Sequence, residues 1–267
     1  MSERVTLHNQ LIETPEILIK SGRFSEVMKL TQANRKAYEE ASAEKQFYDL
    51  VLLFRAAIFG SARFDRGSKD FKFVTELARG LVEARGIDIV TGGGMGIMKA
   101  ANRGLNCAKG LARKNGEKCK ARNIGVRVNL PLEERGNPHL HINTLHREFH
   151  TRLKAFESQI KGAYIAPGGD GSLLELAYFL QLKQVGHVEK DFPIIVHPFW
   201  NEILDATYRT FYHNRIQEGE TPTISEKDLN LVVVSENIPD IVDAFTARYD
   251  FWRKNFRDKV RFVTSEN

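Results

Sequence analysis

The sequence has few cysteines and no long apolar run. Cys107 and Cys119 are its only two cysteines among 267 residues, and they form no CxxC motif. We therefore expect neither a disulfide framework nor a zinc knuckle, and a reducing compartment fits best. No apolar run approaches the roughly 20 residues of a membrane helix, and the first ten residues, MSERVTLHNQ, lack the apolar core of a secretory signal. These absences predict a cytoplasmic protein without membrane attachment.

A strong excess of one charge is also absent. The formal net charge is +5 and the pI is about 9.1, a mild basic balance that suits an anionic ligand. Six basic residues lie in the segment from residue 109 to residue 122. A nucleic-acid surface typically has aromatic residues among its basic ones, and this segment has none. We expect no nucleic-acid partner, and interpret residues 110–122 as a basic insertion that forms a solvated loop or a lid over an anionic substrate.

Short apolar runs alternate with helical patterns from residue 55 onward. This alternation predicts the α/β class, as a Rossmann-like, doubly wound parallel sheet with helices on both faces. A helix rich in Phe, Tyr and Trp is expected after the last strand, and another at the end of the chain. Residues 1–50 are expected to form a helical N-terminal arm, and residues 51–267 one nucleotide-binding domain. Strands are expected at 56–59, 87–90, 124–128, 163–166, 193–197 and 229–234.

Three glycine-rich turns follow predicted strands. They have the sequences GSAR, GGGMG and PGGDGS, and the last precedes a helix expected over residues 173–183. Because the carboxyl ends of parallel strands share one edge of the sheet, we expect the turns to form one ligand site. Uncovered backbone N–H groups at a helix N-terminus favour an anion, most often a phosphate. The candidate phosphate-binding residues are Gly60, Ser61, Gly93, Gly94, Gly96, Gly168, Gly169, Gly171 and Ser172.

The common dinucleotide and triphosphate motifs do not fit these turns. Lys99 stands where the third glycine of the dinucleotide fingerprint belongs, and the chain has no GK[ST] sequence. The turns therefore predict a phosphate site of mononucleotide size.

Glu175 has two interpretations. Ser172 and Glu175 have the spacing of a capping box, in which the serine caps the helix and the glutamate returns to the serine N–H. In the other interpretation, Glu175 lies about one turn from a bound phosphate, at a distance that suits a ribose.

Several histidines raise the question of a metal site. His146 and His150 are expected to share a helix face, but their segment HREFH is not the HExxH motif, and no acidic third ligand accompanies it. His139 and His141 are interpreted, like the other two, as exposed or substrate-facing side chains. We expect no metal.

Four segments together resemble one protein family. PGGDGSLLE at residues 167–175 is similar to the PGGxGTxxE signature of the LOG-type phosphoribohydrolases, long labelled "lysine decarboxylase-like". TGGGMGIM at residues 91–98 resembles the glycine-rich segment of that family, and FHTR at 149–152 its arginine motif. IFGSAR at 58–63 resembles its first strand and turn. The resemblance covers about residues 55–235.

The resemblance implies a usually dimeric, Rossmann-like enzyme that hydrolyses the N-glycosidic bond of a nucleoside 5′-monophosphate. The products are a free base and ribose 5-phosphate, and AMP is the expected substrate. Carried over by position, Arg152 and Glu175 form the catalytic pair, and the turn from Gly168 to Ser172 holds the phosphate. No metal or organic cofactor is implied.

Some positions depart from the family pattern. Ser172 replaces a threonine, Leu153 stands where many members have lysine, and Lys99 where relatives often have glutamate. The last two, with the basic insertion, bear on base preference rather than on the fold. Nothing in the sequence suggests a pyridoxal-phosphate site, so lysine decarboxylation is not expected. The alternative is a non-catalytic nucleotide or cofactor carrier or sensor on the same fold, although a carboxylate beside a phosphate is a liability in a pure binder.

Overall fold

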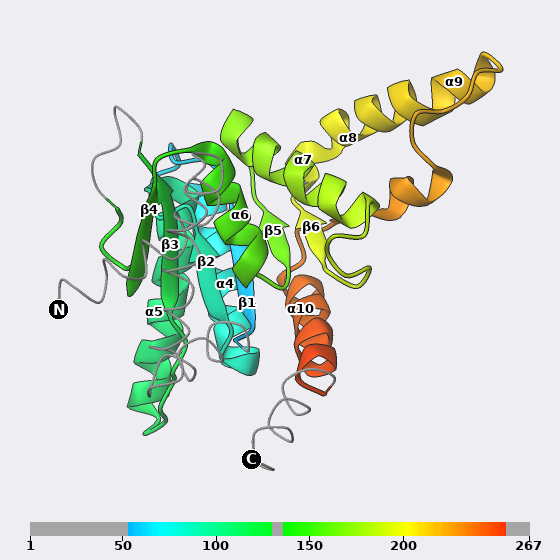
Figure 1. The fold of residues 1–267 in the computed structure, drawn as a ribbon. Coiled ribbons are helices and arrows are strands. Elements are labelled where there is room, and N and C mark those ends of the chain that lie inside the picture. The colour runs from blue at the N-terminus through cyan, green and yellow to red at the C-terminus, as the bar shows by residue number, and fades with distance from the viewer. Residues whose placement is uncertain (1–52, 130–135, 255–267) are drawn as a thin grey trace, which may run out of the picture.

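The computed structural model describes residues 53–129 and 136–254, and these form one seven-stranded sheet (Figure 1). Every strand pair is parallel, in the order β4-β3-β2-β1-β5-β6-β7, and helices cover both faces. The expected Rossmann-like fold class is confirmed. The arm expected over residues 1–50 and the helix expected at the end of the chain lie outside the described residues.

The strands are short, and a helix follows each of them in the described chain except β3, whose connection to β4 includes residues outside the described ranges. The strands are β1 (Arg55–Phe59), β2 (Asp88–Thr91), β3 (Asn123–Val128), β4 (Ile142–His146), β5 (Ala163–Ile165), β6 (Ile194–Val196) and β7 (Val233–Val234). The α-helices are α4 (Lys69–Arg85), α5 (Gly96–Lys114), α6 (Phe149–Gln159), α7 (Asp170–Gln184), α8 (Asn201–Tyr208), α9 (Asn214–Gln217) and α10 (Ile238–Trp252). The 3₁₀ segments are η1 (Pro198–Trp200) and η3 (Glu226–Asn230), and η2 (Arg209–His213) is π-helical.

Two apolar cores lie on the two faces of the sheet. On one face, α4, α5 and α10 pack over the strands, with Leu77, Leu105 and Phe245 fully buried. On the other face, α6 and α7 contribute Phe156 and Phe179. Each strand of the sheet's centre is buried on both sides, which explains why the strands appear in the sequence as continuous apolar runs.

The strand predictions are confirmed, with two differences. The sixth predicted strand, at 229–234, forms only at its end as β7. Strand β4 was not predicted, because its buried positions are the polar Thr144 and His146. The expectation that His146 and His150 share a helix face is therefore wrong: His146 ends β4, where it is buried rather than exposed, and His150 lies in α6.

The basic residues 110–122 do not form a lid over the glycine turns. The first five end helix α5, and the rest lead into the amino end of β3. Lys118 and Lys120 line a cavity at the amino edge of the sheet, opposite the edge where the glycine turns lie. This corrects the lid interpretation, because the stretch precedes a strand rather than following one.

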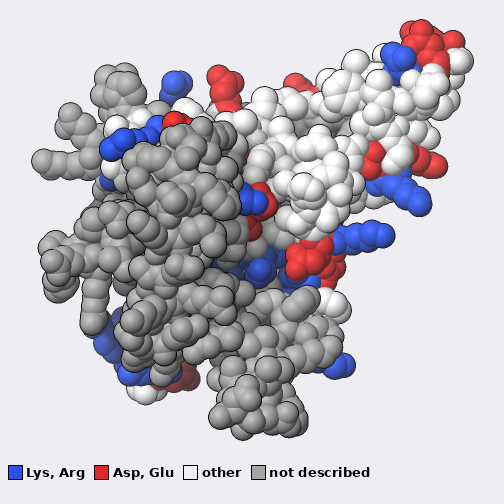
Figure 2. All heavy atoms as spheres, in the orientation of Figure 1, with Lys and Arg blue, Asp and Glu red and all other residues white. Residues whose placement is uncertain are grey.

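A helical arm made of α8, η2 and α9 projects from the body of the molecule (Figure 1). Leu204 is the only buried residue within these three segments. In the view of Figure 2, residues other than Lys, Arg, Asp and Glu cover much of the arm. No helix among the described residues is long and apolar enough to cross a membrane.

Candidate functional site

The three glycine turns meet at the carboxyl edge of the sheet, around a cavity of about 680 Å³. They are joined by backbone hydrogen bonds: Ser61 N donates to the carbonyl of Pro167 (3.1 Å), and Ile97 N donates to the carbonyl of Ser61 (2.9 Å). The central position of β1, between β2 and β5, places its turn between the other two. The expectation that the turns share one edge is thus confirmed.

Glycine is required where these turns touch. At Gly60, a Cβ atom would lie 2.6 Å from Ile97 Cγ2, the side chain that follows the second turn. Gly96 has a φ of +59°, and a Cβ there would collide with the backbone of Ser61 and Ala62. The turns are therefore packed together as a rigid floor.

Helix α7 begins earlier than the capping-box interpretation requires. Its N-cap is Gly169, which offers no side-chain cap, so Ser172 is the third helical residue and is buried under Gly168. Ser172 therefore does not cap the helix, which corrects the capping-box interpretation, and Glu175 is not its capping partner. Because Asp170 and Gly171 are the first helical residues, their N–H groups have no carbonyl one turn earlier in the helix.

Arg152 is held from three directions. Its Nε donates to the carbonyl of Val126 (3.0 Å), and its guanidinium lies over the Phe156 ring, 5.1 Å from the centroid. Its Nη2 is 2.9 Å from Oε1 of Glu175. Gly92 makes room for it, since a Cβ at Gly92 would lie 2.6 Å from Nη2. The side chains of Arg152 and Glu175 are 11% and 5% exposed, so the pair is almost withdrawn from water.

Burial dominates the electrostatics of Glu175. Loss of hydration disfavours the carboxylate and raises the pKa of Glu175 to about 7, although the neighbouring Arg152 acts in the opposite direction. At neutral pH the carboxyl group is thus divided between its two protonation states. This is the condition under which a carboxylate works best as a general base.

The predicted site residues divide into two groups. Those that line the cavity are Gly60, Ser61, Arg152, Gly168, Gly169, Gly171 and Glu175. Those that lie behind its wall are Gly93, Gly94, Gly96 and Ser172, all of them buried.

The second turn is fixed by Asn137, which the sequence analysis did not single out. Asn137 Nδ2 donates to the carbonyl of Gly94 (3.0 Å) and to Oδ1 of Asn102 (2.9 Å), and its backbone N donates to the carbonyl of Gly93 (2.9 Å). Gly93 N in turn donates to Oγ1 of Thr91 (3.1 Å). The N–H group of Gly93 and the carbonyls of Gly93 and Gly94 are therefore engaged within the protein. No motif marks Asn137, because its partners are distant in the sequence.

Several further side chains line the cavity. Arg63 and Phe149 stand inside segments already noted, IFGSAR and FHTR, so their positions had a signal in the sequence. Arg127 and Phe199 had none. In the described ranges, no group of three or more His, Cys, Asp or Glu side chains is arranged to hold a metal ion.

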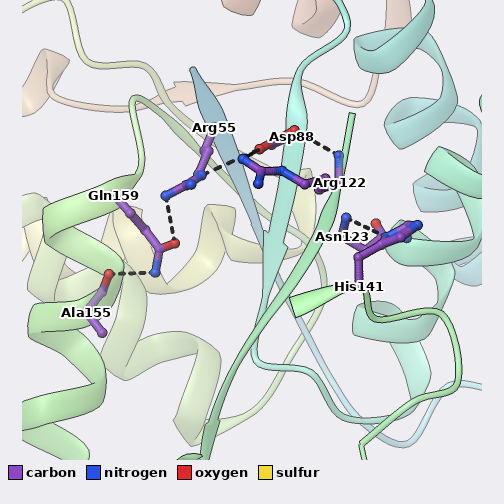
Figure 3. A network of polar contacts seen from close by, with 7 residues as sticks. All are labelled: Arg55, Asp88, Arg122, Asn123, His141, Ala155 and Gln159. Atoms are coloured by element: carbon purple, nitrogen blue, oxygen red, sulfur yellow. Dashed lines mark hydrogen bonds and ion pairs between the residues drawn. The ribbon is translucent and has the colours of Figure 1, made fainter. Parts of the chain in front are cut away.

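A second buried arginine–carboxylate pair lies at the opposite edge of the sheet (Figure 3). Arg55 Nε is 3.6 Å from Oδ2 of Asp88, and both side chains are at most 5% exposed. Asp88 Oδ1 also accepts from the backbone N of Arg122 (2.8 Å), and Arg55 Nη1 donates to Gln159 (3.2 Å). Burial lowers the pKa of Arg55 despite the opposing effect of Asp88.

Comparison with known proteins gives one family match. The family model described as "possible lysine decarboxylase" matches residues 98–245, more than half of the chain and including both Arg152 and Glu175. No curated protein sequence matches the chain.

Solved structures align at low identity. The molybdenum cofactor carrier protein of Chlamydomonas reinhardtii has a TM-score of 0.49 at 15% identity, covering 74% of this chain and 99% of its own. The molybdenum cofactor binding protein of the phototrophic bacterium Rippkaea orientalis has a TM-score of 0.49 at 16% identity, with coverages of 73% and 96%. The structural-genomics target TM1055 has a TM-score of 0.48 at 15% identity, with coverages of 71% and 97%.

Proposed function

The chain belongs to the LOG-like family described as "possible lysine decarboxylase", and on that premise we propose that it hydrolyses the N-glycosidic bond of a nucleoside 5′-monophosphate. The expected substrate is AMP, and the products are the free base and ribose 5-phosphate. Glu175 carries this proposal: a buried carboxyl group with a pKa of about 7, paired with an arginine in the same cavity as a glycine turn at a helix N-terminus.

The phosphate site in this proposal is the start of α7. The N–H groups of Asp170 and Gly171 are the first of the helix and point out of its positive end. Gly169 and Gly171 are exposed, and a Cβ built at either one meets nothing within 4 Å. Binding the phosphate here supplies positioning energy away from the bond that breaks.

Glu175 lies one turn further along α7, on the side of the helix that faces the cavity. Breaking the bond from C1′ to the base builds positive charge on the ribose, which the carboxylate stabilises. The carboxylate also takes a proton from the attacking water, whose oxygen bonds to C1′. The electron pair of the broken bond leaves with the base, which takes up one proton. One water is consumed for each nucleotide.

Arg152 remains protonated, so it is no base in this scheme. Its contacts with Val126, Phe156 and Glu175 make it a rigid anchor for the carboxylate. It holds one carboxylate oxygen and leaves the other for water or for a ribose hydroxyl.

A panel of nucleoside 5′-monophosphates tests the reaction. The purified full chain is incubated with each one in the presence of a chelator, and free base and ribose 5-phosphate are measured. We expect equal amounts of both products from AMP. Tight binding of a nucleotide without ribose 5-phosphate from any member of the panel would contradict the enzyme and support a non-catalytic carrier.

We also propose that the chain forms a homodimer. The projecting arm has Ile203, Phe211 and Ile216 at 39–53% exposed, and a helix with so little buried surface is not stable alone in water. Light scattering on the wild type and on Phe211→Asp tests this. We expect a dimer that dissociates in the variant, whereas a wild-type monomer would contradict it.

A further inference from the structure

Two half-exposed phenylalanines stand on opposite flanks of the cavity. Phe149 is 47% exposed and Phe199 is 52% exposed, and both line the cavity. Neither ring belongs to the two apolar cores. Exposed rings at the wall of a ligand cavity are surfaces on which a planar ligand can stack.

The order of the strands places the two rings. Phe199 is in η1, which follows β6, and Phe149 is the first residue of α6, which follows β4. Between them along the sheet edge lie the turn after β5 and the turns after β1 and β2. The glycine turn at α7 is thus nearer to the Phe199 flank. Arg152, one helical turn after Phe149, is nearer to the Phe149 flank.

The covalent structure of a nucleotide indicates which of the two phenylalanine rings lies near the base. In a nucleoside 5′-monophosphate, the base is attached to C1′ and the phosphate-bearing C5′ to C4′, so the two groups leave the ribose at opposite ends, on either side of O4′. With the phosphate at the start of α7 and C1′ beside Glu175, the base extends away from α7 toward Arg152. Met98 and Val128, which follow β2 and end β3, provide further apolar surface on that flank.

We propose that Phe149 is the platform on which the base stacks, and that it selects for the larger face of a purine. This inference rests on the proposed function for the position of the phosphate and of C1′. Phe199, of the same type and similar exposure in the same cavity, lies on the phosphate flank and makes no contact with the base. The two residues therefore form a matched pair for an experiment.

The experiment measures equilibrium affinities for AMP, CMP and ribose 5-phosphate by calorimetry. The full chain carries Glu175→Gln so that no nucleotide is hydrolysed, and the second change is Phe149→Leu, Phe149→Tyr or Phe199→Leu. Stacking of a base on an aromatic ring is worth enough that we expect Phe149→Leu to weaken AMP about tenfold. The loss for CMP is smaller, and ribose 5-phosphate binds unchanged. Phe149→Tyr retains the affinity for AMP.

The ratio of the affinities for AMP and ribose 5-phosphate isolates the base. Phe199→Leu is expected to leave this ratio unchanged. A ratio that falls in Phe199→Leu but not in Phe149→Leu, or equal weakening of both ligands in Phe149→Leu, overturns the proposal. If the wild-type chain hydrolyses no monophosphate, the proposed reaction fails, while the affinity ratio still decides whether Phe149 is the platform.

Discussion

The two edges of the sheet each bury one arginine–carboxylate pair, in different surroundings. At the amino edge, Asp88 is paired with Arg55 and also accepts from Arg122, so protein groups occupy its oxygens (Figure 3). Both carboxylates line a cavity, so the difference lies in their partners: at the carboxyl edge, Arg152 is the one cation that the described residues pair with Glu175, through a single carboxylate oxygen. A carboxylate satisfied by protein holds the fold together, whereas one held through a single oxygen is available for chemistry.

The largest expected effect is the loss of activity when Glu175 is replaced, which replacement of Asp88 does not cause. In the proposed reaction, Glu175→Gln removes the general base and the negative charge beside C1′, so we expect kcat to fall by at least about 10³-fold. The glutamine still accepts a hydrogen bond from Arg152, and the variant no longer buries a carboxylate. Because burial has already raised the pKa of Glu175 to about 7, the carboxylate itself is disfavoured in the fold, and we expect the melting temperature of the variant to match or exceed that of the wild type. Ribose 5-phosphate release and thermal unfolding are the measurements, and retained turnover would remove Glu175 from the mechanism.

Asp88→Asn is the counterpart at the amino edge. It leaves the buried guanidinium of Arg55 without its anion, so we expect a loss of about 3 kcal/mol in the free energy of unfolding. The kcat of the folded protein stays near that of the wild type, because Asp88 lies at the far edge of the sheet. Urea unfolding and steady-state kinetics are the two measurements. An Asp88→Asn variant that is as stable as the wild type but inactive would contradict this assignment, because Asp88 would then serve the reaction rather than the fold.

Gly92 tests whether the position of Arg152 matters. In Gly92→Ala the new Cβ lies 2.6 Å from Nη2 of Arg152 and 2.7 Å from Sδ of Met98, so the guanidinium must shift. A displacement of this size is expected to lower kcat about 100-fold. Gly110→Ala is the control, because a Cβ there meets nothing within 4 Å. Equal activity in both variants would show that the position of Arg152 is not critical.

The pH dependence reports the burial of Glu175. Its raised pKa of about 7 predicts that kcat rises with pH and levels off above that value, with a rate about tenfold lower one unit below it. In the folded protein the carboxyl group keeps a proton that the unfolded chain releases at a lower pH. Its contribution to stability is therefore complete below the unfolded pKa and is lost as pH rises through about 7. A kcat that is constant from about pH 5.5 to 8 would contradict a catalytic role for this ionisation.

The sequence predicts the central strands and the glycine turns at their carboxyl ends better than the contacts between distant segments. Apolar runs and glycine turns identify six of the seven strands and the carboxyl-edge cavity, because both are local signals. The polar inward face of β4 hides that strand. The spacing of Ser172 and Glu175 indicates a capping box with a helix that starts at Leu173, yet the helix begins three residues earlier, at Asp170, with Gly169 as its N-cap. The spacing of two side chains does not encode this backbone conformation. The bonds of Asn137 to Gly93 and Gly94 depend on tertiary structure alone.

The smallest expected effect concerns the two glycines at the ends of β2, one at each edge of the sheet that the comparison above distinguishes. Gly92 follows this strand at the carboxyl edge, and Gly86 precedes it at the amino edge, where it ends α4 with a φ of +63°. Gly86→Ala places a Cβ in the left-handed region at a cost of about 1 kcal/mol in stability. Gly86→Asn loses less, because asparagine tolerates this conformation. Neither variant is expected to change kcat, so the denaturant midpoint shifts while the activity stays the same. In Gly92→Ala, by contrast, the activity is expected to fall. Equal stability of the alanine and asparagine variants would show that Gly86 is not needed for its left-handed conformation.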